Sequence, residues 1–144
     1  MLLRFARPVS PAKVHGVICA DCLVPEFWFR RLPPDDDHEA ETYLATGFCM
    51  GQFAEVVCSM GREAAVSAAV AQLDEMFHNR GDEFSASGED GSQRTSAAAN
   101  LINGELHDWA TEPFIHLGYT PPLAGAGAAP FGELAKPLPN GRVL

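Results

Sequence analysis

The chain has 144 residues, of which 47% are apolar and 20% charged, and its formal net charge is −9 at pH 7. This composition is that of a globular chain with one ordinary domain, and it excludes disordered and fibrous proteins. The acidic balance excludes nucleic acid as a partner, because phosphate binding depends on clustered Lys and Arg side chains and only 10 basic residues are present.

No membrane segment is predicted. The longest apolar runs, 64–70 and 124–131, are far shorter than the roughly 20 residues that a membrane-spanning helix needs. The first eight residues, 1–8, contain arginines within their apolar stretch, which is atypical of a secretory signal. We therefore expect a soluble chain, with the cytoplasm as its default compartment.

Alternating apolar residues predict that the chain opens with strands at 2–5, 14–20 and 26–30. In the third of these, Phe27 and Phe29 point to one side and Trp28 to the other, so we expect both faces of the sheet to be covered. The prolines and aspartates of 33–37 predict a turn. A further strand is predicted at 42–49.

The apolar period then changes to that of a helix. One amphipathic helix is predicted from 52 to 60 and a second from 62 to 78. The glycine-, serine- and acid-rich stretch 79–99 predicts a surface loop, and 101–109 a last strand. The apolar stripe of the second helix consists of Val66, Ala69, Val70, Leu73, Met76 and Phe77.

Strands followed by helices and a last strand predict an α+β fold, with a mixed β-sheet and helices packed on one of its faces. The glycine pattern G-x-G-x-x-G of dinucleotide-binding domains does not occur in the sequence. We expect residues 1–120 to form the α+β region and residues 121–144 to form an irregular tail.

Four cysteines occur, at 19, 22, 49 and 58, too few for a disulfide framework in a chain of this length. Cys19 and Cys22 form a Cys-x-x-Cys pair, but a zinc site needs a second such pair. A redox pair typically opens a helix, whereas this pair follows a strand-like run. Half-buried ordinary thiols are the favoured interpretation, and metal or redox chemistry is the alternative.

Three aromatic residues recur every five positions near the end of the chain: Trp109, Phe114 and Tyr119, set around Pro113 and Gly118. Together they predict an apolar cage. An aromatic side chain in a loop between turn residues, as Tyr119 is, is costly unless a cavity uses it. The cage is therefore the best candidate for a binding site in the sequence.

The segment 109–119 is followed by Leu-Ala-Lys-Pro at 134–137 and by Gly-Arg-Val-Leu at 141–144. With these motifs in this order, the chain resembles the C-terminal portion of the FAD-dependent amine oxidases, the family of monoamine oxidases, polyamine oxidases and flavin histone demethylases. The predicted strands and Gln72-Leu-Asp-Glu-Met-Phe77 at the end of the second helix extend the resemblance over most of the chain.

The resemblance implies the fold of that family's substrate-binding domain and the activity of an oxidoreductase. Such a flavoprotein oxidises primary amines, secondary amines or polyamines and reduces O₂ to H₂O₂. Trp109, Phe114 and Tyr119 match the substrate-binding aromatic cage, and Trp109 also matches a residue that lies beside the FAD. The resemblance places no catalytic residue and no metal ligand in this chain.

The family's active-site lysine precedes the strand that matches 2–7, and its flavin-contacting segment follows the match to 141–144. The chain is therefore expected to be a fragment, inactive by itself and incomplete without a FAD-binding Rossmann domain supplied in cis or in trans. The alternative is a non-catalytic module that keeps the aromatic cage and binds amines or a partner protein.

Overall fold

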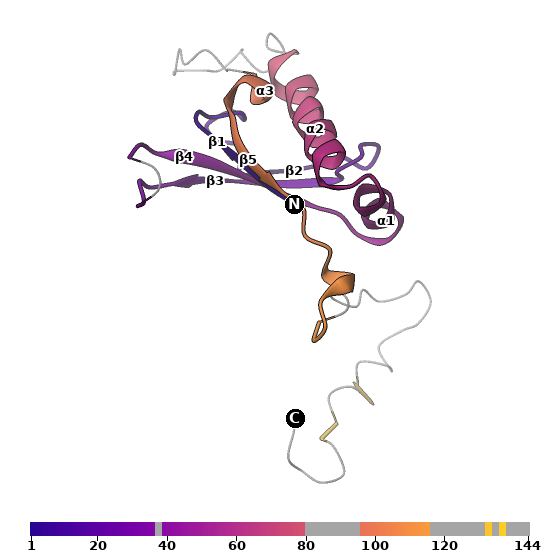
Figure 1. The fold of residues 1–144 in the computed structure, drawn as a ribbon. Helices are drawn as coiled ribbons and strands as arrows, with labels where there is room; N and C mark the ends of the chain where they lie inside the picture. The colour runs from indigo at the N-terminus through magenta and orange to yellow at the C-terminus, as the bar shows by residue number, and fades with distance from the viewer. Residues whose placement is uncertain (37–38, 80–95, 116–131, 134–135, 138–144) are drawn as a thin grey trace. The chain divides into compact units, whose positions relative to one another are not determined.

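A computed structural model of the chain describes residues 1–36, 39–79, 96–115, 132–133 and 136–137 (Figure 1). The chain divides into two units, Met1–Asp108 and Trp109–Leu144, each described here by itself. The first unit has one five-stranded sheet together with helices, which confirms the predicted α+β class.

The strands of the sheet lie in the order β2-β3-β4-β1-β5, and every described pair is antiparallel. The predicted mixed sheet is therefore wrong for these strands. The helices connect β4 to β5, which run in the same direction, but β1 lies between the two and pairs with both. The strands are β1 (Leu2–Phe5), β2 (Gly16–Ile18), β3 (Glu26–Leu32), β4 (Thr42–Phe48) and β5 (Leu101–Glu105).

The cross-strand register places one apolar row beneath the helices. Leu3 lies opposite both Ala45 of β4 and Gly104 of β5, and Ala45 in turn lies opposite Phe29 of β3. Between Arg4 and the next residue the β1–β5 register shifts, which is a β-bulge in the last strand. Side chains that are opposite in an antiparallel pair share a face, so this row forms the floor of the core.

The second predicted helix packs on this face and supplies the other half of the core (Figure 1). Five of its six predicted stripe residues are buried, and Met76 is half-buried. Val66 approaches β5 so closely that a Cβ on Gly104 would come within 2.5 Å of Val66 Cγ1. The helices are α1 (Gly51–Ser59), α2 (Arg62–Leu73), the π-helix η1 (Asp74–His78) and α3 (Ala97–Asn100).

Several elements begin or end at residues other than those predicted. The first, third and fourth strands and both long helices are confirmed, whereas β2 is shorter than predicted. The predicted amphipathic character of α1 is weak, because only Val57 is buried and Val56 is 50% exposed. The predicted loop 79–99 ends in the short helix α3, and its residues 80–95 lie outside the described part of the chain. The last strand ends at Glu105 instead of 109.

Two polar side chains tie α2 and η1 to the rest of the unit. Gln72 accepts a hydrogen bond from the Val24 amide (3.0 Å) and donates one to the Val24 carbonyl (2.8 Å). Asp74 accepts hydrogen bonds from the backbone amides of Ala97 (2.5 Å) and Ala98 (3.1 Å) and from the Ser96 hydroxyl (2.9 Å). The first contact holds the β2–β3 connection, and the second holds the start of α3.

Candidate functional site

Trp109 is the first residue of the short 3-10 helix η2 (Trp109–Thr111), not the end of a strand as predicted. Its side chain is 51% exposed. The Trp109 carbonyl accepts a hydrogen bond from the Glu112 amide (3.4 Å). A turn at this point gives the indole a position outside any regular sheet, at the first residue of the second unit.

The other two predicted cage residues are placed less fully. Phe114 is 98% exposed, and Tyr119 lies outside the described residues. Within the described part of the second unit, Trp109 and Phe114 therefore do not enclose a cavity between them. The role of Trp109, Phe114 and Tyr119 as substrate-binding residues stays a prediction, as does the role of Trp109 beside FAD.

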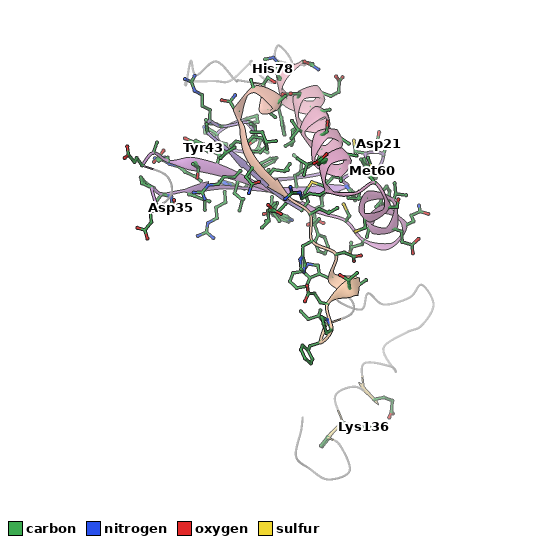
Figure 2. All side chains as sticks on the ribbon, in the orientation of Figure 1. Asp21, Asp35, Tyr43, Met60, His78 and Lys136 are labelled. Carbon is green, nitrogen blue, oxygen red and sulfur yellow. The ribbon has the colours of Figure 1, made fainter. Side chains whose placement is uncertain are left out.

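Side chains project from both faces of the sheet (Figure 2). On the face opposite α2, several apolar side chains are open to solvent. Leu2, Thr46, Trp28 and Gly16 form one cross-strand row on it. The indole of Trp28 lies against Gly16, where a Cβ would come within 2.8 Å of Trp28 Cε3. We call this surface the open face, and it comprises Leu2, Ile18, Trp28, Leu44, Thr46 and Phe48.

The expectation that both sides of the sheet are covered does not hold among the described residues, because the open face is exposed. Ile18 is 79% exposed, Trp28 53% and Leu2 48%, whereas Phe27 on the opposite face is completely buried. The alternation correctly predicts that Phe27 and Trp28 lie on opposite faces of the sheet, but it does not predict whether either face is covered. Whether a second layer covers a face is decided by the rest of the chain or by a partner.

Charged side chains lie on the open face among the apolar ones, because Arg4 is opposite Leu44 and Glu26 is opposite Ile18. Arg4 donates a hydrogen bond from Nε to the Thr42 hydroxyl (2.9 Å) and pairs with Asp35 (2.5 Å). Glu26 accepts a hydrogen bond from Trp28 Nε1. This bond holds the indole to its own strand, so the largest aromatic group of the face is oriented before any partner arrives. The sequence pattern gives no sign of this orientation.

The four cysteine thiols are free and half-buried, as predicted. Burial raises the pKa of the Cys22 thiol, and the neighbouring Cys19 and Asp21 raise that pKa further. Burial also raises the pKa of Cys49 and of Cys58. These three thiols are therefore protonated at neutral pH, which is unfavourable for metal binding because the thiolate is the ligand.

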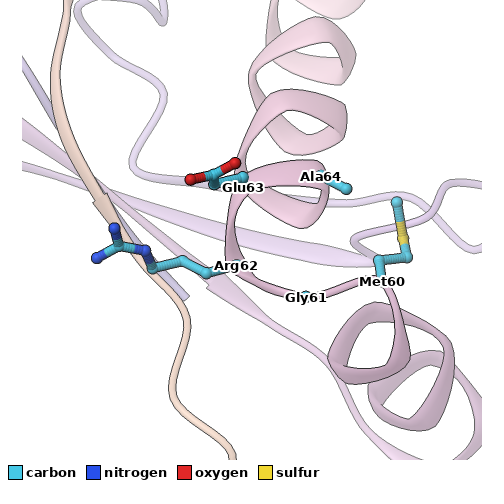
Figure 3. A pocket seen from close by; sticks show the side chains of 5 residues that line it. All are labelled: Met60, Gly61, Arg62, Glu63 and Ala64. Carbon is cyan, nitrogen blue, oxygen red and sulfur yellow. The ribbon is translucent and has the colours of Figure 1, made fainter.

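Two shallow hollows in the described residues do not form convergent sites. The first is lined by residues 60–64 at the junction of α1 and α2, and their side chains point in different directions (Figure 3). Arg62, for example, reaches away from it to Glu105 at 3.3 Å. The second is lined by Ala6, by 39–42 and by Ile102. Neither includes a residue of the predicted cage.

Among the described residues, no group of three or more His, Cys, Asp and Glu side chains is arranged to hold a metal ion. No helix in the described part of the chain has both the length and the apolar character needed to cross a membrane. Comparisons of the sequence and the structure with protein-family models, curated proteins and solved structures found no match.

Proposed function

We propose that this chain is the substrate-domain portion of a FAD-dependent amine oxidase. The aromatic segment 109–119 and the two motifs that follow it support the proposal. The observation that carries it is the open face. An exposed apolar patch on a globular unit typically marks a surface that another element covers, and a flavin-binding domain supplies such a cover in this family.

Bound FAD would supply the chemistry of such an enzyme, namely oxidation of the carbon beside the amine nitrogen with O₂ as the final electron acceptor and H₂O₂ as a product. The part of this chain is to bind the neutral amine and to exclude water. Rings at 109, 114 and 119 offer apolar walls to the neutral amine, and during entry their negative faces attract its protonated form by about 0.5–2 kcal/mol per contact. The phosphate cradle for FAD would come from the FAD-binding domain, since the glycine pattern G-x-G-x-x-G does not occur in this sequence.

The test compares two proteins. One is the chain itself, and the other is the longer protein that is expressed when the coding sequence of the chain is extended by the coding sequence adjoining it. We expect the longer protein to be yellow, from bound flavin, and to release peroxide when a panel of primary amines, secondary amines and polyamines is added. The 144-residue chain should do neither. A longer protein that binds no flavin, or that releases no peroxide with any amine, contradicts the proposal.

Within the longer protein, Tyr119→Ala is expected to lower amine turnover at least tenfold while the flavin stays bound, because it removes a cage wall but no cofactor contact. Tyr119→Phe is the matched control and should retain most of the turnover, since the ring is kept. Steady-state peroxide release and flavin absorbance measure the two effects. Unchanged kinetics in Tyr119→Ala would remove Tyr119 from the site.

The second candidate is a non-catalytic module that binds amines or a partner protein. The half-exposed Trp28 and the strongly exposed Ile18 favour it, because exposed aromatic and aliphatic anchors are typical of protein interfaces. The comparison of the chain with the longer protein also distinguishes the two candidates. Calorimetric binding of an amine or a partner by the chain alone, with no flavin in the longer protein, supports the module.

A further inference from the structure

The connection between β2 and β3 contains a cysteine pair in a tight turn. Cys22 donates a backbone hydrogen bond to the Cys19 carbonyl (3.3 Å), which closes a four-residue turn around Ala20 and Asp21. A turn of this kind brings its end Cα atoms to within about 7 Å of each other. Disulfides join Cα atoms about 4.4–6.8 Å apart, so the backbone already has the span that a Cys19–Cys22 bond needs.

The turn is held from both sides by residues that do not take part in it. The Cys19 amide donates to the Pro25 carbonyl (2.8 Å), which closes the connection across its base. Val24 is fixed to α2 by its two hydrogen bonds with Gln72. The chain on either side of the cysteines is therefore anchored, and the separation of the two residues does not depend on a free loop.

The surroundings of the thiols allow access and do not favour a permanently reduced pair. Both cysteines are half-buried, and Ala20 and Asp21 between them are exposed, so a small molecule reaches the turn from solvent. The Cys22 thiol contacts the Asp21 carboxylate at 3.9 Å. This environment raises the pKa of Cys22, first by burial, and so gives the reduced state no stabilised thiolate.

We propose that Cys19 and Cys22 are a reversible redox site that takes low-molecular-weight disulfides such as oxidised glutathione. One protein thiol loses its proton, attacks a sulfur of the small disulfide and releases one small thiol, leaving a mixed disulfide. The second protein thiol loses its proton and attacks the protein sulfur of that mixed disulfide, releasing the second small thiol. Two protein thiols are oxidised, one small disulfide is reduced to two thiols, and the two protons pass to the released thiolates.

Cys49 and Cys58 provide an internal comparison. Cys49 follows β4 and Cys58 lies in α1, so the two are not joined by one turn.

The short ring that a Cys19–Cys22 bond closes adds little stability through chain entropy, because that contribution grows with loop length. The bond is therefore expected to open again when the glutathione pool becomes reducing, which is the behaviour of a switch and not of a structural crosslink.

The experiment equilibrates the purified chain in glutathione buffers from fully reduced to fully oxidised, quenches with acid, and maps the cysteine peptides by mass spectrometry. We expect the free thiols to fall from four to two, with Cys19 and Cys22 linked to each other and no glutathione attached. Adding reduced glutathione should restore all four. In Cys22→Ser, Cys19 should instead stop as a glutathione adduct, because the second displacement is lost.

A Cys49→Ser/Cys58→Ser double variant is the matched control and should form the same Cys19–Cys22 link. The mapping on the unmodified chain stands even if a variant folds poorly. Three results would overturn the proposal: cysteines 19 and 22 that stay reduced in oxidised glutathione, separate glutathione adducts on both without a link, or a link between Cys49 and Cys58 instead.

Discussion

At the scale of single residues, Gln72 is the most informative side chain in the sheet–helix interface. Its amide group makes both hydrogen bonds that a neighbouring strand would make to Val24, whose side chain is completely buried. Buried backbone groups need partners, and none of the five described strands pairs with this segment. The helix therefore completes the hydrogen bonding of the connection that carries the cysteine pair.

We expect Gln72→Leu to lower the free energy of unfolding by about 1–3 kcal/mol, because the Val24 amide and carbonyl lose their partners on the inside of the fold. Gln52→Leu, on the exposed first turn of α1, is the control and should change stability by less than about 0.5 kcal/mol. Urea denaturation of the three proteins measures both effects. If Gln72→Leu and the unchanged chain had equal urea midpoints, water would be replacing the two hydrogen bonds to the Val24 backbone, and the prediction would be wrong.

The residues also show what sequence patterns can and cannot locate. The alternation of Phe27 and Trp28 correctly gave their opposite sides, because strand geometry alone sets it. The hydrogen bonds of Gln72 and Asp74 were not predicted, since they join residues far apart in the chain. For the cage, the five-residue spacing predicted three aromatic rings, and the two that the structure describes, Trp109 and Phe114, are exposed. The spacing of residues in the sequence does not show whether their side chains enclose a cavity.

At the scale of elements, Asp74 links the end of the long helical run to the last strand. Its carboxylate binds two backbone amides at the start of α3, which leads directly into β5. The first amides of a helix have no partner within that helix, so an external carboxylate satisfies them and complements the positive end of the helix dipole. The contact joins a residue that precedes the segment 80–95 to residues that follow it.

Asp74→Ala is expected to destabilise the unit by about 1–3 kcal/mol and to act locally first, because charge-assisted hydrogen bonds to α3 are lost. Amide hydrogen exchange should accelerate most at Ala97 and Ala98. Glu55→Ala removes an exposed carboxylate in α1 and serves as the control. Uniform acceleration over the whole sheet, with no excess at α3, would contradict the local role of Asp74.

The end of β5 illustrates why element boundaries are harder to predict than elements. The apolar pattern continued to Trp109, but the ladder ends at Glu105, which lies opposite Leu2, the first residue of β1. A strand extends only as far as its neighbour can accept its hydrogen bonds. That limit belongs to the partner strand and is absent from the local pattern. The end of β2 has the same cause, because Ile18 lies opposite Glu26, the first residue of β3.

At the scale of the whole molecule, the α+β class could be predicted from the order in which strand-like and helix-like patterns follow one another in the sequence. The order of the strands within the sheet could not. Local patterns gave four strands before two helices and one strand after them. They could not show that β1 lies between β4 and β5, which is why the expected mixed sheet is antiparallel throughout its described pairs. Strand order is set by long-range pairing, which no short window of sequence contains.

The open face predicts concentration-dependent self-association of the isolated chain. We expect Ile18→Lys to reduce this association, because a charge in the most exposed apolar position of the face opposes burial of that face. Ala64→Lys, on the exposed side of α2, adds the same charge elsewhere and should leave association unchanged. Sedimentation velocity over a range of concentrations distinguishes them. A strictly monomeric unchanged chain would contradict the prediction.

The central position of β1 also sets the order in which the fold can be completed. During synthesis β1 receives one neighbour when residues 43–46 of β4 emerge and the other only when Leu101–Glu105 emerges. Pairings between such distant segments slow folding, because long loops must close before any contact rewards them. One edge of β1 therefore stays unpaired until Leu101–Glu105 emerges, and an unpaired strand edge is prone to aggregation during that interval.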